Sequence, residues 1–411
     1  MEYISIKEAG RKWNLAPELI FEQCENGLIA AVKIGTEWMI PNNLTYPELN
    51  WKTFNHKLNN KLLYIPKKCP FLIMTDLYNS PGRGDELVKK YRNDQPEIAL
   101  LFEAQLAYFR GNIERAYQLA QYCLLNKTCF EIQIGIGLVL SLCALYKGDA
   151  HLWKEAKHCI MSVPCQNENN RQLVAFWLAA GESCLYNNLG FPKSFQNGCF
   201  DFLPIDSYPI ARFFYVKYLL LESENTLPNP KGENYRYMLL MEKISAICEP
   251  LISQTKTEGI ILPEIYLRLI CAIAYHNNGN EDMAAIHLDR AIELALPDQL
   301  LSPFAEYRQP LDFLMDERLG RIDKKALQKV RELNKKLLDG WVPLHNSVLK
   351  REKSNDLTTR EREVSRLAVY GMTNIEIAEY LHISLNTVKQ ALWHAMDKTG
   401  CKKRVDLKKY L

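Results

Sequence analysis

A short run of polar side chains near the carboxyl end of the chain is suited to hydrogen bonding and not to catalysis. Asn386, Thr387, Lys389, Gln390 and Trp393 stand close together in the sequence. Side-chain amides can bond to the edges of bases, and a lysine or a threonine can hold a phosphate. No nucleophile and no pair of acidic side chains accompanies them, so the run predicts a binding surface and no enzyme.

Three short helices are expected to position this surface. Residues 358–361 and 373–376 each match a capping box, and Ser384 is a favourable N-cap for a third helix. The apolar residues of the three segments recur at helical spacing. They are Val364, Leu367, Ala368, Ile377, Ala378, Leu381, Val388, Leu392 and Ala395. If these residues share one core, the polar run lies on the outer face of the third helix, and residues 382–384 form the tight turn of a helix-turn-helix.

Spaced identities across residues 356–411 resemble the LuxR-type helix-turn-helix domain. The matching segments are Leu357-Thr358-x-Arg360-Glu361-x-Glu363-Val364, Gly371-x-Thr373-Asn374-x-Glu376-Ile377-Ala378, Leu381-x-Ile383-Ser384-x-x-Thr387-Val388-Lys389 and Lys398-x-Gly400 with Arg404. The resemblance implies DNA contacts from Thr387, Lys389 and Gln390 and a dimerisation helix from about residue 404. Three positions depart from the usual histidine, isoleucine and leucine, and we expect them to loosen the core or alter half-site preference: Ala391, Ala395 and Thr399.

The predicted DNA-binding surface of this domain combines the polar run with residues of the resemblance. Its members are Thr373, Asn374, Asn386, Thr387, Lys389, Gln390, Trp393 and Arg404. From residue 350 to 411 the chain has 13 Lys and Arg against 8 Asp and Glu, a net charge of +5. Because the whole chain carries +3, the preceding residues sum to −2. A local basic excess favours binding to phosphates. The alternative left open is that the three helices form only a small core that docks a protein.

The first fifty residues predict a second small domain. Ser5 and Glu8 match a capping box at the start of one helix, and Pro17 suits the first turn of another. The short apolar stretches of residues 28–40 indicate a β-hairpin wing. The order of these elements and the segment of residues 31–41 resemble the excisionase branch of the MerR superfamily. That resemblance implies a winged helix-turn-helix whose second helix enters the major groove.

The charge of this N-terminal segment argues against such a role. The expected second helix, residues 16–25, carries three glutamates and no lysine or arginine, and residues 1–50 hold seven acidic against four basic side chains. Phosphates would be repelled. Three wing residues alone suit DNA contact, namely Lys33, Thr36 and Trp38. DNA contact through the wing and docking or dimerisation through this domain both remain open.

The long middle of the chain, residues 96–340, repeats an apolar helix, a glycine-containing turn and a second helix with small residues. The turns are centred on Gly111, Gly148 and Gly279. Hairpins of this kind bury their apolar faces by stacking, so the segment resembles degenerate tetratricopeptide repeats, although their strict period is absent. Residues 288–313 resemble the end of the sensor domain of MalT-like LuxR regulators, which implies a signal received by the array.

The nature of that signal is not given by the sequence. The turn of residues 80–84 lacks the Gly-Lys-Ser/Thr ending of a phosphate loop, so control by a nucleotide is not expected. Aromatic residues of the array either line a pocket for an inducer or pack between helices, and packing is the favoured interpretation. They include Trp177, Phe213, Phe214, Tyr215 and Tyr218.

Cysteine usage and hydropathy indicate where the protein works. The twelve cysteines contain no Cys-x-x-Cys pair, which favours buried thiols in a reducing cytoplasm. The nearest approach to a metal cluster is His151, His158, Cys159 and Cys165, and surface histidines with core thiols are the favoured interpretation, so neither a metal nor a cofactor is predicted. No secretory signal is expected at the start of the chain. The longest apolar run, residues 134–146, is too short to span a bilayer, so a soluble protein without a membrane partner is expected.

The predicted fold is mainly α, with a tetratricopeptide-like array of helical hairpins between two helix-turn-helix domains. The expected parts are the winged helix of residues 1–50, a connecting segment of residues 51–95, the array of residues 96–340, a linker of residues 341–355 and the LuxR-type domain of residues 356–411. They predict a cytoplasmic bacterial transcription regulator in which the array controls DNA binding. The expected partners are double-stranded DNA, RNA polymerase, a second copy in a homodimer on DNA and a small-molecule inducer. The alternative is an adaptor whose terminal domains dock proteins.

Overall fold

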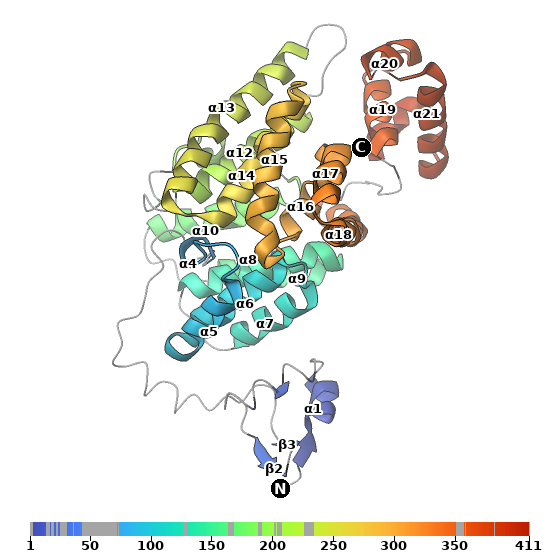
Figure 1. Ribbon diagram of the computed structural model, residues 1–411. Helices are drawn as coiled ribbons and strands as arrows, with labels where there is room; N and C mark the ends of the chain where they lie inside the picture. The colour runs from blue at the N-terminus through green and yellow to red at the C-terminus, as the bar shows by residue number, and fades with distance from the viewer. Residues whose placement is uncertain are drawn as a thin grey trace. The chain divides into compact units, whose positions relative to one another are not determined.

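The computed structural model is mainly α-helical, which confirms the predicted fold class (Figure 1). It describes residues 3–13, 17, 20–21, 24, 31–35, 37–42, 72, 74–125, 130–162, 168–187, 191–200, 203, 208–225, 234–350, 357, 359–381 and 383–410. Within these ranges no helix has both the length and the apolar character needed to cross a membrane. The N-terminal segment, the helical array and the C-terminal domain are described in turn, each by itself.

The N-terminal segment contains a small antiparallel sheet and one complete helix. Its elements are β1 (Tyr3–Ser5), α1 (Ile6–Trp13), β2 (Val32–Ile34) and β3 (Glu37–Pro41), with the strand order β1-β3-β2. The predicted hairpin is present, with Val32 paired to Met39. Strand β1 is an addition that the sequence did not indicate. The predicted capping box is also formed, because the amide of Ser5 donates to Glu8 Oε2 over 2.8 Å. The expected second helix lies largely outside the described residues.

The array consists of helices that pack on their neighbours in the chain. The helices are α4 (Met74–Leu77), α5 (Gly84–Asp94), α6 (Pro96–Phe109), α7 (Ile113–Leu125), α8 (Phe130–Lys147), α9 (Ala150–Met161), α10 (Glu168–Ser183), α11 (Lys193–Asn197), α12 (Tyr208–Asn225), α13 (Asn234–Glu258), α14 (Ile261–Asn277), α15 (Glu281–Ala295), η2 (Leu296–Asp298), α16 (Ser302–Glu306), α17 (Arg308–Ile322) and α18 (Lys324–Leu349). The pairs α5 with α6, α8 with α9, α13 with α14 and α14 with α15 lie side by side (Figure 1). The array thus begins before residue 96, inside the segment expected to be a connection.

The predicted hairpin turns are confirmed by their backbone geometry. Gly111, Gly148 and Gly279 have φ angles of +78°, +65° and +75°, a region that residues with a side chain rarely adopt. After the second turn Asp149 caps α9 by accepting from two backbone amides, and after the third Asn280 caps α15. These caps satisfy donors that the start of a helix leaves free. The turns and caps together explain why the chain reverses at these points.

A buried carboxylate joins the first helices of the array to its later part. Asp298 is only 4% exposed and lies at the end of η2. It accepts hydrogen bonds from the hydroxyl of Tyr78 at 2.7 Å and from the amides of Gly82 and Gly84 at 2.6 and 3.2 Å. Tyr78 and Gly82 donate to Oδ2, whereas Gly84 donates to Oδ1, which also accepts a hydrogen bond from the guanidinium of Arg110 at 3.0 Å. The carboxylate therefore satisfies two backbone amides of a turn that lies more than 200 residues earlier in the chain.

The aromatic residues singled out in the sequence pack against other rings of the array. Trp177 and Phe213 are buried, and Phe214 meets Trp177 edge to face with ring centroids 5.7 Å apart. Tyr215 and Tyr218 each lie against a further phenylalanine. This arrangement agrees with packing between helices, for which aromatic rings prefer edge contacts.

The last helix of the array, α18, extends into the segment predicted as a linker. Residues 341–349 form its final turns, so the expected linker of residues 341–355 begins later than the sequence indicated. The indole of Trp341 donates to the carbonyl of Cys184 over 2.7 Å and its ring packs beside Tyr186 and His345. These contacts hold the end of α18 on the array.

The backbones of α18 and α8 touch at a glycine. Gly340 lies within α18, and a Cβ added there would clash with the carbonyl oxygens of Leu145 and Tyr146 in α8. A Cβ added to Gly148, in the turn after α8, would lie 3.1 Å from the carbonyl oxygen of Gly340. The obstacles are backbone atoms, which cannot rotate away as a side chain can. A close crossing of this kind requires glycine.

We predict that Gly340→Ala lowers the free energy of unfolding by about 1–3 kcal/mol, because the added methyl group forces the two helices apart. The measurement is urea unfolding of the full chain, followed by far-ultraviolet circular dichroism. Gly181→Ala is the matched control, since Gly181 lies in helix α10 and its added Cβ meets no atom within 4 Å. The control is expected to be neutral or to stabilise by less than about 1 kcal/mol. Equal unfolding midpoints for the two variants would contradict the close crossing.

Candidate nucleic-acid interface

The C-terminal domain consists of three α-helices and a short 3-10 helix around one apolar core. The elements are α19 (Thr359–Val369), α20 (Asn374–Tyr380), α21 (Leu385–Thr399) and η3 (Arg404–Tyr410), drawn in red in Figure 1. The core residues come from all of them: Leu357, Val364, Leu367, Ala368, Met372, Ile377, Ala378, Val388, Ala391, Leu392, Ala395 and Leu407. The pairs α19 with α21 and α20 with α21 are in contact. The predicted shared core of three helices is therefore present.

Two of the predicted helix starts are capped as the sequence indicated. At α20 the amide of Thr373 donates to Glu376 Oε2 at 2.7 Å, and the amide of Glu376 donates to Thr373 Oγ1 at 3.3 Å. At α21 the amide of Thr387 donates to Ser384 Oγ at 3.1 Å. The capping box predicted from Thr358 falls outside the described residues. The caps set the entry angles of α20 and α21, which is how a helix-turn-helix fixes its second helix.

Helix α21 has one apolar and one polar face. Val388 and Ala395 are fully buried, and Ala391 and Leu392 are each 7% exposed. The opposite face exposes the predicted set of Asn386, Thr387, Lys389, Gln390 and Trp393. Trp393 is 64% exposed, which is unusual for a tryptophan that only packs. The structure therefore gathers five of the eight predicted DNA-binding residues on one exposed face of a single helix.

The lysines of this domain differ in whether they form an ion pair. Lys398 Nζ lies 2.8 Å from the buried carboxylate of Glu361, so its charge is used inside the domain. By contrast, Lys389 is exposed and forms no ion pair with the described part of the chain. The same holds for the exposed Lys402 and Lys403, which follow α21. Lysines in this state can neutralise phosphates without first breaking an internal ion pair.

Arg404 is held inside the domain. Its Nε and Nη2 atoms donate to the carbonyl of Ala368 at 3.2 and 2.9 Å, and Nη2 also donates to the carbonyl of Met372. Its Nη1 atom lies 3.5 Å from Asn374 Oδ1. The structure thus places Arg404, Asn374 and Thr373 together at the turn before α20, apart from the exposed face of α21. Arg404 ties the end of α19 to the start of α20, which sequence reasoning did not identify.

The three residues that depart from the LuxR pattern lie in the core or form a hydrogen bond within α21. Ala391 and Ala395 are buried in the core, and the hydroxyl of Thr399 donates to the carbonyl of Ala395 over 2.7 Å. The segment expected to form a dimerisation helix is a 3-10 helix, η3, whose Leu407 is fully buried. Val405 of the same segment is 56% exposed.

The described part of the N-terminal wing offers fewer side chains for DNA contact than the exposed face of α21 does. Lys33 is exposed on β2, and its Nζ lies 5.3 Å from the ring centre of Trp38 on β3. This is a cation–π distance. Thr36 lies outside the described residues.

Comparison with known proteins identifies the C-terminal segment. Residues 355–411 match the family model described as bacterial regulatory proteins, luxR family. The match covers the capped helices and the exposed face of α21, and it supports a DNA-binding transcription regulator. No curated protein and no solved structure matches the chain.

We predict that Arg404→Ala loosens the C-terminal domain, because two carbonyl groups and one amide side chain lose their donor. The loss of such hydrogen bonds costs about 1–3 kcal/mol, which corresponds to amide exchange that is about 5- to 150-fold faster. The measurement is hydrogen–deuterium exchange of peptides from residues 359–381 in the full chain. Lys403→Ala is the control, since the neighbouring Lys403 is exposed and should leave exchange unchanged. Equal protection from amide exchange in both variants would rule out that Arg404 holds the end of α19 to the start of α20.

Proposed function

We propose that this protein is a transcription regulator that binds double-stranded DNA through the exposed face of α21. The observation that carries the proposal is the separation of α21 into a buried face and an amide-rich, cationic face, within a segment that matches the luxR family. A helix with this division is able to enter the major groove while its apolar face stays in the domain.

The roles of the side chains follow from their chemistry. Asn386 and Gln390 stand near the start of α21 and carry amides, which pair with adenine in a bidentate manner. Lys389 and Thr387 offer a charge and a hydroxyl to phosphates, and the free amides at the start of α21 add to this. Trp393 is the remaining large group on this face. Arg404 and Asn374 then act by positioning the turn, with Thr373 as the cap of α20.

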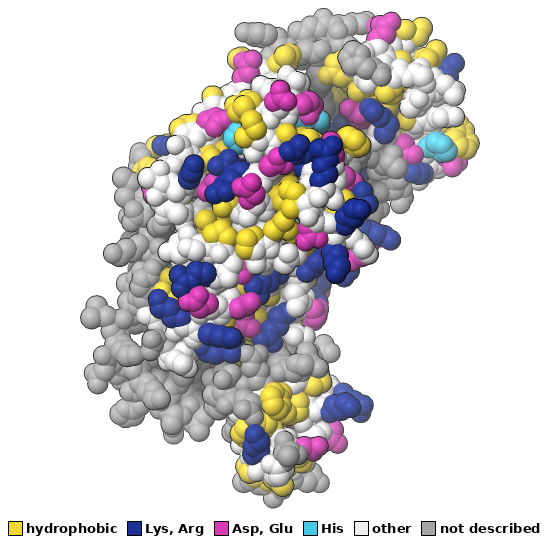
Figure 2. All heavy atoms as spheres, viewed as in Figure 1, with side chains coloured by type: hydrophobic (Ala, Val, Ile, Leu, Met, Phe, Trp, Pro, Cys, Tyr) yellow, Lys and Arg dark blue, Asp and Glu magenta, His cyan; other side chains and the backbone are white. Residues whose placement is uncertain are grey.

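We further propose that the helical array receives the signal and controls how the C-terminal domains pair on DNA. On the face of the array drawn in Figure 2, Lys and Arg side chains are mostly interspersed with Asp and Glu, apart from the more basic helix α18. The signal is a small-molecule inducer or a partner protein, and the active form is a homodimer that acts on RNA polymerase in the cytoplasm. The sequence-based resemblance to MalT-like regulators is the support for this part of the proposal.

Two variants distinguish the general affinity for DNA from the recognition of a particular base sequence. Lys389→Ala should weaken binding to every DNA sequence and reduce the slope of log affinity against log salt by about 1. Gln390→Ala should chiefly reduce discrimination at one base pair, by about 1–3 kcal/mol. The measurement is a gel-shift titration of the full chain on operator and unrelated DNA at several salt concentrations.

Lys335→Ala serves as the control, since Lys335 is exposed on α18 in the array. It should match the unaltered protein in affinity and in salt slope. Unchanged affinity in both α21 variants would refute DNA binding through this helix. Lys33→Ala in the same titration tests the wing, whose contact with DNA would appear as a lower salt slope.

The adaptor alternative makes the opposite prediction for the same chain. If the terminal domains dock proteins, the full chain shows no salt-dependent affinity for DNA and retains a protein partner in a pull-down experiment. The unpaired lysines around α21 favour DNA over this alternative.

A further inference from the structure

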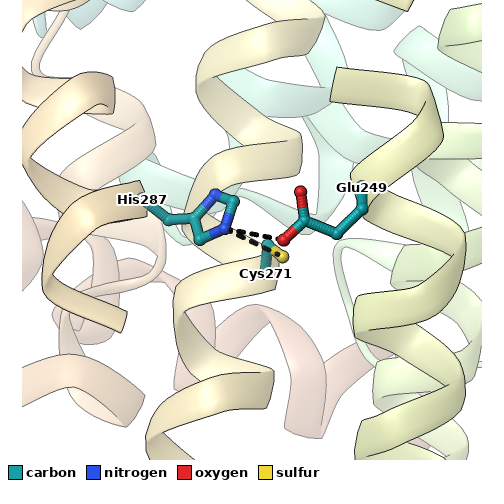
Figure 3. A group of neighbouring side chains, drawn as sticks. All are labelled: Glu249, Cys271 and His287. Atoms are coloured by element: carbon teal, nitrogen blue, oxygen red, sulfur yellow. Dashed lines mark hydrogen bonds and ion pairs between the residues drawn. The ribbon is translucent and has the colours of Figure 1, made fainter. Parts of the chain in front are cut away.

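Three side chains from consecutive helices of the array converge on one point. Glu249 belongs to α13, Cys271 to α14 and His287 to α15, and one ligand-type atom of each lies within 4.8 Å of the other two. Figure 3 shows the imidazole of His287 facing both the thiol and the carboxylate. Cys271 and His287 are buried, whereas the side chain of Glu249 is 41% exposed. The cluster is therefore closed on one side and open to solvent on the other.

Two distances in the cluster are close to those of a tetrahedral metal site. His287 Nε2 lies 3.7 Å from Cys271 Sγ and 3.0 Å from Glu249 Oε1. Zinc bonds of about 2.3 Å to sulfur and about 2.0–2.1 Å to nitrogen and oxygen, at tetrahedral angles, put the ligand atoms about 3.6 Å and about 3.4 Å apart. The sulfur–nitrogen distance already fits. The nitrogen–oxygen distance needs an increase of a few tenths of an ångström, which the exposed Glu249 can supply.

Neighbouring groups orient the same atoms. The hydroxyl of Tyr275 donates to Glu249 Oε1 at 2.9 Å, and its ring stacks on His287 at 5.5 Å between centroids. The buried Cys248 lies in hydrogen-bond contact with Cys271 and brings a second thiol to the cluster. The hydrogen bonds from Cys248 and His287 lower the pKa of the Cys271 thiol.

We propose that Glu249, Cys271 and His287 bind one divalent transition-metal ion, zinc by preference, which links α13, α14 and α15. Thiolate and imidazole ligands select zinc over calcium and magnesium, which prefer oxygen. Binding takes a zinc ion and releases the thiol proton of Cys271 to solvent, with the imidazole neutral and the carboxylate ionised. The fourth position falls to water from the exposed side or to Cys248.

The site is built for an exchangeable ion. His287 Nδ1 is buried and has no hydrogen-bond partner among the described residues, so no acceptor supports the ring behind the metal. The absence of such a partner lowers metal affinity by about 10–100-fold relative to a supported histidine. The open side at Glu249 gives the ion a path to solvent.

Cobalt is a direct probe, because it takes the place of zinc and absorbs light. We expect Co²⁺ added to the reduced, metal-stripped full chain to produce a thiolate-to-cobalt band in the near ultraviolet that saturates at about one ion per chain and disappears on addition of Zn²⁺. Cys271→Ser should abolish the band where water is the fourth ligand, and should lower its intensity and the affinity where Cys248 is the fourth ligand. His287→Gln and Glu249→Gln should each weaken cobalt binding by about tenfold or more.

Cys159→Ser is the matched control, since Cys159 is a buried thiol elsewhere in the array, near Gln133. This variant should bind cobalt as the unaltered protein does. Circular dichroism without metal establishes that each variant is folded, and Glu249→Gln, the change at the exposed side of the cluster, is informative even if Cys271→Ser does not fold. The proposal is overturned by a folded chain without the band, or by a band and affinity that Glu249→Gln and Cys271→Ser leave unchanged.

Discussion

The arrangement of the helices in the array depends on the hydrogen bonds that the carboxylate of Asp298 accepts. It gathers the hydroxyl of Tyr78, two backbone amides and the guanidinium of Arg110 around one buried side chain. Without it the hydroxyl of Tyr78 and the two amides would lose this acceptor, at a cost of about 1–3 kcal/mol per group, whereas Arg110 would keep its ion pair with Asp85. The donors come from the first helices and the acceptor follows α15. These hydrogen bonds therefore join the beginning of the stack of hairpins to its later part. The first of these helices, α4, lies against α14.

Local features of this fold were accessible from the sequence, and long-range ones were not. Capping boxes, glycine turns and helical periodicity depend on residues a few positions apart, and those predicted at Ser5, Thr373 and Gly148 are present. The partners of Asp298 are separated from it by most of the array, so no local pattern marks them. Strand β1 is three residues long and gives too short a pattern. The linker was predicted to begin at residue 341, inside α18, and nothing local marks that the helix continues through Gly340 and Pro343, residue types that commonly end helices.

In the C-terminal domain, too, local features could be predicted from the sequence and long-range contacts could not. The outer face of α21 follows from the spacing of three apolar residues, and the exposure of Lys389 and Gln390 agrees with it. The structural role of Arg404 could not be predicted from the sequence. A resemblance identifies the position of the residue and not the carbonyl groups to which its side chain donates. The cluster of Glu249, Cys271 and His287 was missed for a related reason. Its members lie on three helices, and the sequence directed attention to histidines and cysteines that are neighbours in the chain.

The contact of α18 with α8 at Gly340 also constrains how the array can move. Helices that interlock through side chains must lift apart before one can pass the other, which makes their packing bistable. At Gly340 the surfaces that meet are backbone, with Gly148 beside them and no side chain between. Sliding α18 by one residue would place the side chain of Asp339 or Trp341 where only a glycine fits. The crossing therefore fixes the register of α18 on α8, so that α18 moves together with α8.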